Sequence, residues 1–178
     1  MIFALAGRRV DAVNAAVPRF PLSNVPLVRT RIRKLLGEYH PHNLVSSAAC
    51  GVDLIALDEA TALGIPCQVI LPFSRDQFRS TSVSDRPGDW GKLFDKLLQD
   101  ADARGGVLEL QEAADTNAYL AVNRRILDVA QDLMKLHRQP ARAVLVWDGV
   151  SSGDQDVTEQ FGAEARKRGF VLIELCTL

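Results

Sequence analysis

The sequence is poor in cysteine, in aromatic residues and in net charge, and each shortage argues against a class of protein. Its 178 residues include 3 cysteines, Cys50, Cys67 and Cys176, and they form no CxxC pair. A disulfide framework is therefore not expected, and a reducing compartment fits. The net charge of −1 and the aromatic content of 6% provide neither a broad basic surface nor a stacking platform. These two properties argue against nucleic acid as a partner.

Long apolar runs and clusters of metal-binding side chains are also missing. No stretch approaches the ~20 apolar residues of a membrane-spanning helix, and the first apolar run, 2–6, is too short for a signal-peptide core. His40-Pro41-His42 is the only histidine pair in the sequence, and no cysteine or histidine cluster accompanies it. We therefore expect a cytoplasmic protein with no membrane partner, no metal and no evident cofactor.

The composition is otherwise that of a globular protein, with 47% apolar and 24% charged residues. A chain of this length can bury a sizeable core in one domain. We find no internal repeat, low-complexity segment or domain boundary. A single domain over residues 1–178 is therefore expected.

Short apolar runs alternate with amphipathic segments along the whole chain. Most runs are continuous, which is typical of strands buried on both faces of a parallel sheet, and we predict strands over 2–6, 43–47, 67–71, 106–110, 143–147 and 170–175. Helices are expected over 25–38, 52–63, 89–103, 116–136 and 154–168. The alternation predicts an α/β fold, a Rossmann-like doubly wound, mainly parallel sheet of about six strands with helices on both faces. Two long connections, 8–24 and 72–88, interrupt this plan, and such loops are often functional.

The junction between the second strand and its helix is the most informative segment. It reads Ser46-Ser47-Ala48-Ala49-Cys50-Gly51-Val52-Asp53, a strand that ends in small residues and turns directly into a helix. Such a turn leaves backbone N–H groups open at the positive end of the helix dipole, where anions bind. We predict a phosphate-bearing ligand at Ser46, Ser47, Ala48 and Gly51, although a plain helix cap is the alternative. Asp53 would repel a phosphate, so we expect it to order the loop or to read a hydroxyl group.

The connections after other strands supply further candidates, because ligands in open α/β sheets bind beyond the carboxyl ends of the strands. After the first strand, Gly7 allows a tight turn and Arg8 can pair with phosphate or carboxylate oxygens. Arg9 is equally well a ligand contact or a surface residue. After the third strand, Arg79 and Arg86 stand among hydroxyl residues, in a loop that either closes over an anion or is simply exposed.

A second strand–loop–helix junction follows the fifth strand, at Trp147-Asp148-Gly149-Val150-Ser151-Ser152-Gly153-Asp154. Asp148 is placed to accept hydrogen bonds from a ribose, although an Asp beside a Gly is also a common turn former. Gly149, Ser152 and Gly153 make a second loop of the phosphate-binding kind. Asn123, in the preceding helix, could bond to a base or ribose or could cap a neighbouring loop. Two such junctions favour a dinucleotide or a nucleotide that lies across both.

In combination, these motifs resemble the SLOG superfamily of Rossmann-like proteins, and the resemblance covers nearly the whole chain. It rests on Gly7-Arg8-Arg9, the 46–53 junction, Asn123-Arg124 and Trp147-Asp148-Gly149. The superfamily includes DprA-type proteins, the LOG (lonely guy) nucleotide hydrolases, and YpsA-like and YspA-like proteins; residues 71–90 are similar to a bacterial branch of it. The resemblance implies a Rossmann-like fold that binds a nucleotide or nucleotide derivative, with a late phosphate loop at 149–153.

Two departures from the superfamily pattern bear on the function. Ala48-Ala49 replaces the paired glycines of the second loop, and the hydrolase signature P-G-G-x-G-T-x-x-E is absent. We therefore expect a sensor or carrier that binds a nucleotide-derived ligand. The alternative is an N-glycosidase that releases free base from a nucleotide; its candidate catalytic carboxylates are Asp148, Asp156 and Glu159, with Asp53 in reserve. DprA-like binding of single-stranded DNA ranks third, and a homodimer is expected by analogy with related folds.

Overall fold

Six strands form one parallel sheet in the computed structural model, which describes residues 1–113 and 115–178. The sheet order is β4-β3-β2-β1-β5-β6, and all neighbouring pairs run parallel. The strands are β1 (Ile2–Gly7), β2 (Asn43–Ser46), β3 (Cys67–Leu71), β4 (Val107–Glu109), β5 (Ala141–Trp147) and β6 (Val171–Cys176). The predicted α/β, doubly wound, Rossmann-like fold is confirmed.

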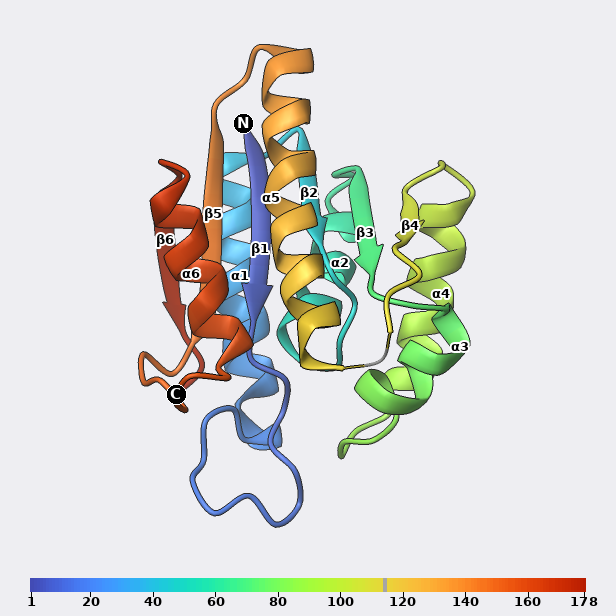
Figure 1. Cartoon of the computed structure of the whole chain (residues 1–178), viewed down its shortest axis with the longest axis vertical. Coiled ribbons are helices and arrows are strands. Elements are labelled where there is room, and N and C mark those ends of the chain that lie inside the picture. The colour runs from blue at the N-terminus through green and yellow to red at the C-terminus, as the bar shows by residue number, and fades with distance from the viewer. Residues whose placement is uncertain (114) are drawn as a thin grey trace.

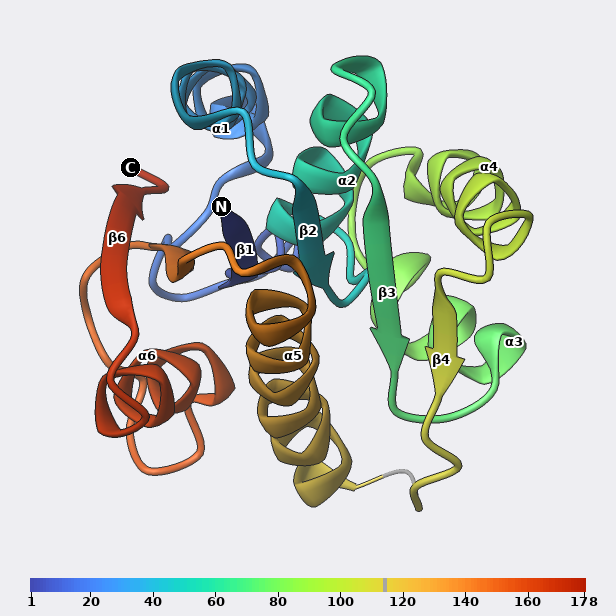
Figure 2. The same ribbon diagram turned by 90° about the horizontal axis from the view of Figure 1, so that it is seen from above.

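Helices cover both faces of the sheet (Figure 2). One face carries α1 (Val25–Tyr39), α2 (Val52–Ala62) and α4 (Trp90–Asp102), and the other carries α5 (Thr116–His137) and α6 (Val157–Lys167). Each face has its own apolar core, because the continuous runs of the central strands point alternate side chains to opposite sides. Within the described residues, no helix is both long and apolar enough to cross a membrane.

The order of the strands reverses between β1 and β5. From β1 to β4, each strand lies beside the previous one on the same side. Helix α5 then crosses back over the sheet to β5, which lies on the other side of β1 (Figure 1). The connections that leave β1 and β5 therefore diverge, and a crevice forms beyond the carboxyl ends of the strands. This end of the sheet, the lower end in Figure 1, also holds the amino-terminal turns of α5 and α6.

The expected element boundaries differ from the observed ones by at most three residues, and the largest shift has a clear cause. The helix predicted over 154–168 begins at Val157, because the Asp156 side chain caps it by accepting from the Thr158 and Glu159 amides. The two predicted long connections are also partly helical. The first ends in a 3₁₀ turn, η1 (Leu22–Asn24), and the second contains α3 (Arg75–Phe78) followed by a π-helical turn, η2 (Arg79–Val83).

Candidate functional site

A cleft of about 280 Å³ opens beyond the carboxyl ends of β1 and β2, next to the position where the strand order reverses. The end of β1 and the β2–α2 junction supply polar and small residues to its wall. Helix α5 supplies mostly apolar ones, and Phe78, Ser82 and the first residues of α6 complete it. Ligands of open α/β sheets bind at this position, and the volume is at the lower end of the range for small-molecule sites.

Two glycines allow the chain segments around the cleft to approach closely. A Cβ atom on Gly7 would lie 2.4 Å from a Val52 methyl carbon and 2.6 Å from the Val146 carbonyl oxygen. Gly51 has a φ of +102°, and a Cβ atom there would lie 2.8 Å from the Val10 nitrogen. Gly7 therefore lets β1 pack closely against the start of α2 and the end of β5. Gly51 lets the β2–α2 junction pack against the loop that follows β1.

The backbone amides of the β2–α2 junction donate largely within the protein. The Ala49 amide donates to Asp53 Oδ2 at 3.2 Å, and the Cys50 amide donates to the Ser82 carbonyl at 3.0 Å. The Val52 amide donates to the Arg8 carbonyl at 3.2 Å. The sequence predicts open N–H groups for a phosphate at this junction, whereas the structure shows three of them already bonded. Ser47 lines the cleft, while Ser46 and Ala48 are fully buried.

Asp53 lies in the cleft wall with one carboxylate oxygen unpaired. The residue is 7% exposed, and its Oδ1 atom is buried without a hydrogen-bond partner. Burial raises the pKa of the Asp53 carboxyl to about 7, although the Ala49 amide and the Arg9 charge act in the opposite direction. Asp53 therefore holds its proton near neutral pH, which is unusual for an aspartate in the first turn of a helix.

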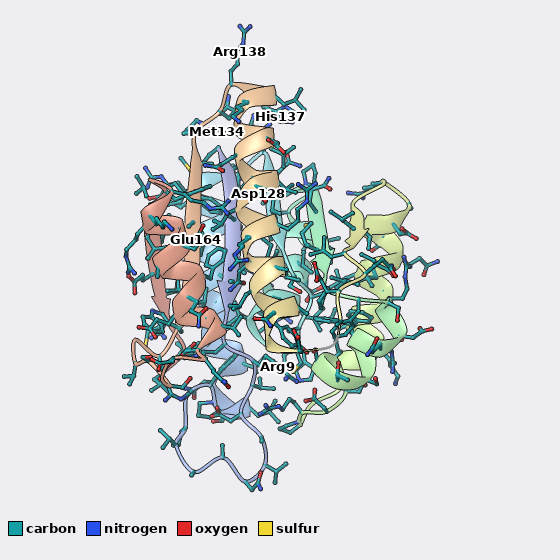
Figure 3. The ribbon with its side chains drawn as sticks, in the orientation of Figure 1. Arg9, Asp128, Met134, His137, Arg138 and Glu164 are labelled. Atoms are coloured by element: carbon teal, nitrogen blue, oxygen red, sulfur yellow. The ribbon has the colours of Figure 1, made fainter. Side chains whose placement is uncertain are left out.

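Arg9 faces the same cleft from the loop after β1, and Figure 3 shows it below the amino-terminal end of α5. Its guanidinium donates to Asp85 and to the Cys50 sulfur, at 3.6 Å from the latter. The Arg9 Nε atom is buried and has no partner. The sequence left Arg9 undecided between ligand contact and surface residue; the structure places it beside Asp53 in the cleft wall.

The β5–α6 junction is organised around Arg8, which is 8% exposed. Arg8 Nε donates to Asp148 Oδ1 at 2.8 Å, and Nη1 donates to Asp156 Oδ1 at 2.6 Å. Nη2 donates to the Val150 carbonyl at 2.7 Å. Asp148 also accepts from Arg19 at 2.9 Å. Arg8, predicted to contact a ligand phosphate, is thus engaged by two internal carboxylates and a carbonyl.

Asp156 fills the amino terminus of α6. One oxygen accepts from the Thr158 and Glu159 amides at 3.1 and 3.0 Å, and the other accepts from the Ser152 amide and hydroxyl at 2.8 and 2.9 Å. Burial alone would raise the pKa of this carboxyl, but the bonds from Arg8, Glu159 and Ser152 outweigh it and hold the pKa far below its usual value. The predicted late phosphate loop therefore closes around a carboxylate of the protein itself.

Gly149 and Gly153 adopt positive φ angles of 80° and 106° in this loop, and Glu159 accepts a hydrogen bond from the Ser151 hydroxyl. The three carboxylates predicted for catalysis, Asp148, Asp156 and Glu159, thus serve the β5–α6 junction. Of the described acidic residues, Asp53 is the one that lines the cleft. No group of three or more acidic, histidine or cysteine side chains suited to a metal is found in the described part of the chain.

Of the remaining predicted ligand contacts, the structure places some in the cleft wall and others outside it. Arg79 forms a two-pronged ion pair with Asp95 at 2.8 and 3.0 Å, and it does not line the cleft within the described structure. Arg86 Nε lies 3.6 Å from Asp85 Oδ2. Asn123 lines the cleft, and its Nδ2 donates to the Val157 carbonyl at 2.8 Å, which also ties α5 to α6. Both alternatives for Asn123, ligand contact and loop cap, are compatible with this position.

A shallower groove of about 370 Å³ adjoins the cleft. The two share Arg9 and the first two residues of α6, Val157 and Thr158. Four arginines line the groove: Arg8, Arg9, Arg19 and Arg86. Tyr119 and Ser82, which the sequence analysis did not select as ligand contacts, lie in the cleft wall and are 3.1 Å apart at their hydroxyl oxygens. Their partnership could not be read from the sequence because 37 positions separate them.

No family model matches the sequence, and no curated protein matches it. Among solved structures, the chain is similar to DNA processing protein A (DprA) from Streptococcus pneumoniae, with a TM-score of 0.41 and 17% sequence identity. The similarity covers 97% of this chain and 57% of that chain, so the present chain spans little more than half of its length. The likeness concerns the fold alone.

One finding stands against the expectation about nucleic acid. The sequence argued against nucleic acid as a partner, whereas the matched solved structure is that of a DNA processing protein. The sequence argument used the net charge and aromatic content of the whole chain. A local surface can differ from that average, and the groove holds four arginines against two aspartates, Asp11 and Asp156.

Proposed function

We propose that this chain binds a nucleotide or a nucleotide-derived small molecule, as a sensor or carrier, in the cleft beyond β1 and β2. The observation that carries the proposal is the pair of unpartnered buried atoms, Asp53 Oδ1 and Arg9 Nε, on two side chains of the cleft wall. An unpaired buried polar atom costs about 1–3 kcal/mol. A ligand that pairs with both atoms recovers that cost. The motifs shared with the SLOG superfamily support the same class of ligand.

A second candidate function, cleavage of a nucleotide N-glycosidic bond, is favoured by one observation. Asp53 has a pKa of about 7 in a cleft of ligand size, and a carboxyl group poised near neutral pH is suited to general acid–base catalysis. Asp148 and Asp156 are less suited to this role because arginines hold both of them. In this candidate, Asp53 takes the place that the sequence gave to Asp148, Asp156 or Glu159.

Isothermal titration against a defined panel tests the proposal. The panel consists of the four ribonucleoside 5′-monophosphates, NAD, ADP-ribose and a short oligodeoxythymidylate. We expect saturable binding of at least one small molecule, with affinity reduced at least tenfold by Asp53→Asn and unchanged by Asp58→Asn. Asp58 is a matched control, because it lies in the same helix and pairs with Arg29 outside the cleft.

Each other result assigns a different function or removes this one. Binding of the oligodeoxythymidylate alone would replace a small-molecule ligand with single-stranded DNA. Release of free base from a monophosphate, lost in Asp53→Asn, would establish the N-glycosidase. No binding to any member by folded protein would contradict the proposal.

A further inference from the structure

The helix amino termini at the two strand–loop–helix junctions, those of α2 and α6, already hold a carboxylate of the protein. Asp156 accepts from the Thr158 and Glu159 amides at the start of α6, and Asp53 accepts from the Ala49 amide at the start of α2. A phosphate at either position would have to displace an internal acceptor and would meet negative charge whenever that carboxylate is ionised. These two helix termini therefore do not provide the open phosphate-binding sites that their sequences predict.

The groups of the cleft wall that lack partners are of a different kind. Arg9 Nε donates a hydrogen bond, and Asp53 Oδ1 accepts one when the carboxyl is ionised and donates one when it is protonated. The two side chains are close enough for the Arg9 charge to act on the Asp53 carboxyl. A donor and an acceptor offered together match a polar ring edge that carries both, as nucleobases do. They match a phosphate poorly, because its oxygens only accept from Arg9 and repel Asp53.

The rest of the wall fits the faces of such a ring. Leu5, Val122 and Ile126 line the cleft with apolar side chains, and Phe78 and Tyr119 add aromatic surface. Small-molecule sites commonly combine apolar walls with a few polar groups that fix orientation. A volume of about 280 Å³ suits the uncharged end of a nucleotide better than a complete dinucleotide.

The adjoining groove shows where a phosphate end would lie. It shares Arg9, Val157 and Thr158 with the cleft and adds Arg8, Arg19 and Arg86, together with two carboxylates, Asp11 and Asp156. All four arginines are partly neutralised: Arg9 and Arg86 both approach Asp85, Arg19 is bonded to Asp148, and Arg8 is bonded to Asp148 and Asp156. The groove is also open to solvent, where ion pairs contribute little and are screened by salt.

Resting on the proposed function, we propose that the cleft recognises the uncharged nucleobase or nucleoside end of its ligand through Asp53 and Arg9. The phosphate end lies outside, along the arginine groove, and contributes a smaller, salt-dependent part of the affinity. Asp53 and Arg9 are thus the residues that determine specificity. Asp156 closes the position where the sequence predicts a second phosphate site.

Paired titrations of the four ribonucleosides and their 5′-monophosphates, at low and at high salt, test this inference. We expect a nucleoside to bind within about tenfold of its monophosphate at high salt, and the advantage of the monophosphate to grow at low salt. Inorganic phosphate alone should bind too weakly to compete. Above pH 7, where Asp53 is ionised, Asp53→Asn replaces the unpaired acceptor with a donor and should weaken nucleoside and monophosphate at least tenfold each, whereas Asp58→Asn should change neither.

The results that overturn the inference differ from those that overturn the proposed function. If monophosphates bind and nucleosides do not, or if Asp53→Asn leaves the affinities unchanged, the inference is wrong and the proposed function stands. If no member of either set binds, the proposed function fails as well. Should Asp53→Asn not fold, Arg9→Lys serves in its place, because it keeps the positive charge and removes the Nε donor. It is expected to weaken both sets to the same extent.

Discussion

The two strand–loop–helix junctions at the carboxyl end of the sheet place an aspartate at the start of a helix, yet the two carboxylates behave in opposite ways. Asp156, at the β5–α6 junction, accepts from Arg8, from three backbone amides and from the Ser152 hydroxyl. Asp53, at the β2–α2 junction, accepts from one amide and leaves Oδ1 unpaired. The pKa of Asp156 lies far below its usual value, while that of Asp53 is raised to about 7.

Both residues are buried, with 3% and 7% of their surfaces exposed, and both lie at the positive end of a helix dipole. Burial raises the pKa of both carboxyls, and its effect is heavier at Asp53. The donors widen the difference, because each hydrogen bond to the charged form, first of all that from Arg8 to Asp156, lowers the pKa and an unpaired buried oxygen does not. The β5–α6 junction is complete, because both oxygens of Asp156 have hydrogen-bond donors within the protein. The β2–α2 junction is incomplete, because Asp53 Oδ1 has no donor and a ligand can supply one.

Removing the carboxylate of the complete junction should have the largest effect. Asp156→Ala leaves Arg8 with one of its two carboxylate partners and uncaps α6, so we expect a loss of about 4 kcal/mol in the free energy of unfolding. Urea denaturation monitored by circular dichroism measures it. Asp154→Ala, at an exposed position of the same loop, is the control and should change stability by less than about 0.5 kcal/mol. A loss below about 1 kcal/mol in Asp156→Ala would contradict the assignment.

At the incomplete junction, Asp53→Asn should change how stability depends on pH. The folded state holds the Asp53 proton up to about pH 7, whereas an ordinary aspartate loses it near 3.8. Wild-type stability therefore falls as the pH rises through this window, by roughly 2.5 kcal/mol between pH 5 and pH 8. Asparagine has no such proton and keeps an acceptor for the Ala49 amide. The variant should thus gain on the wild type by that amount, as urea midpoints across this range will show.

The charged and titratable groups that face Asp53 in the cleft are Arg9 and Tyr119, and Arg9 in turn contacts Asp85 and Cys50. Burial lowers the pKa of the Arg9 guanidinium, but Cys50 and Asp85 outweigh it and raise that pKa above its usual value, so Arg9 stays charged between pH 5 and 8. Asp58→Asn controls for the loss of a carboxylate from α2. An equal gain in that variant, or no pH-dependent gain in Asp53→Asn, would contradict the account.

Gly7 lies between the two junctions, so a methyl group there should disturb both. The added Cβ would meet Val52, the first residue of α2, and Val146, in β5 just before the β5–α6 junction, at distances far below ordinary contact. We expect Gly7→Ala to lose about 2 kcal/mol. Gly37→Ala, within α1 and with no atom in reach of its Cβ, should gain up to about 1 kcal/mol. Thermal unfolding of the two variants compares them directly, and a neutral Gly7→Ala would contradict the close approach.

The smallest effect is expected from Tyr119→Phe in the cleft wall. It removes the contact between the Tyr119 and Ser82 hydroxyls at 3.1 Å, which corresponds to about 1 kcal/mol of stability. It leaves the partners of Asp53 and Asp156 unchanged, so the pH dependence of unfolding should match that of the wild type. An altered pH dependence in Tyr119→Phe would show that the two junctions are not the source of it.

Most of the fold could be predicted from local sequence. The apolar run 67–71 matches β3 at both ends, and the helix predicted from residue 52 begins at Val52, because continuous apolar runs and glycine-rich turns act over short distances. The helical turns over 75–83 were missed. Their sequence is polar and has no helical period, and burial of Phe78 and Val83 against the rest of the protein holds them in place.

The sequence predicted where the candidate site lies, but not which of its hydrogen-bonding groups are open to a ligand. Both junctions were identified, since strand ends, small residues and helix starts are local features. Whether their donors are open depends on contacts between distant residues: Arg8 and Asp156 are 148 positions apart, and Cys50 donates to Ser82. Such pairings are set by the tertiary fold. For the same reason, sequence alone did not place Arg9 with Asp53.

The most direct test of the account is a measurement of the two aspartate pKa values in one sample. Side-chain carboxyl ¹³C resonances of Asp53 and Asp156, followed by NMR over a pH titration of the folded protein, report each group separately. We predict that Asp53 titrates near pH 7 and that Asp156 remains ionised well below the pH at which a free aspartate takes up its proton. Titration of both groups together near the ordinary aspartate value would contradict the account.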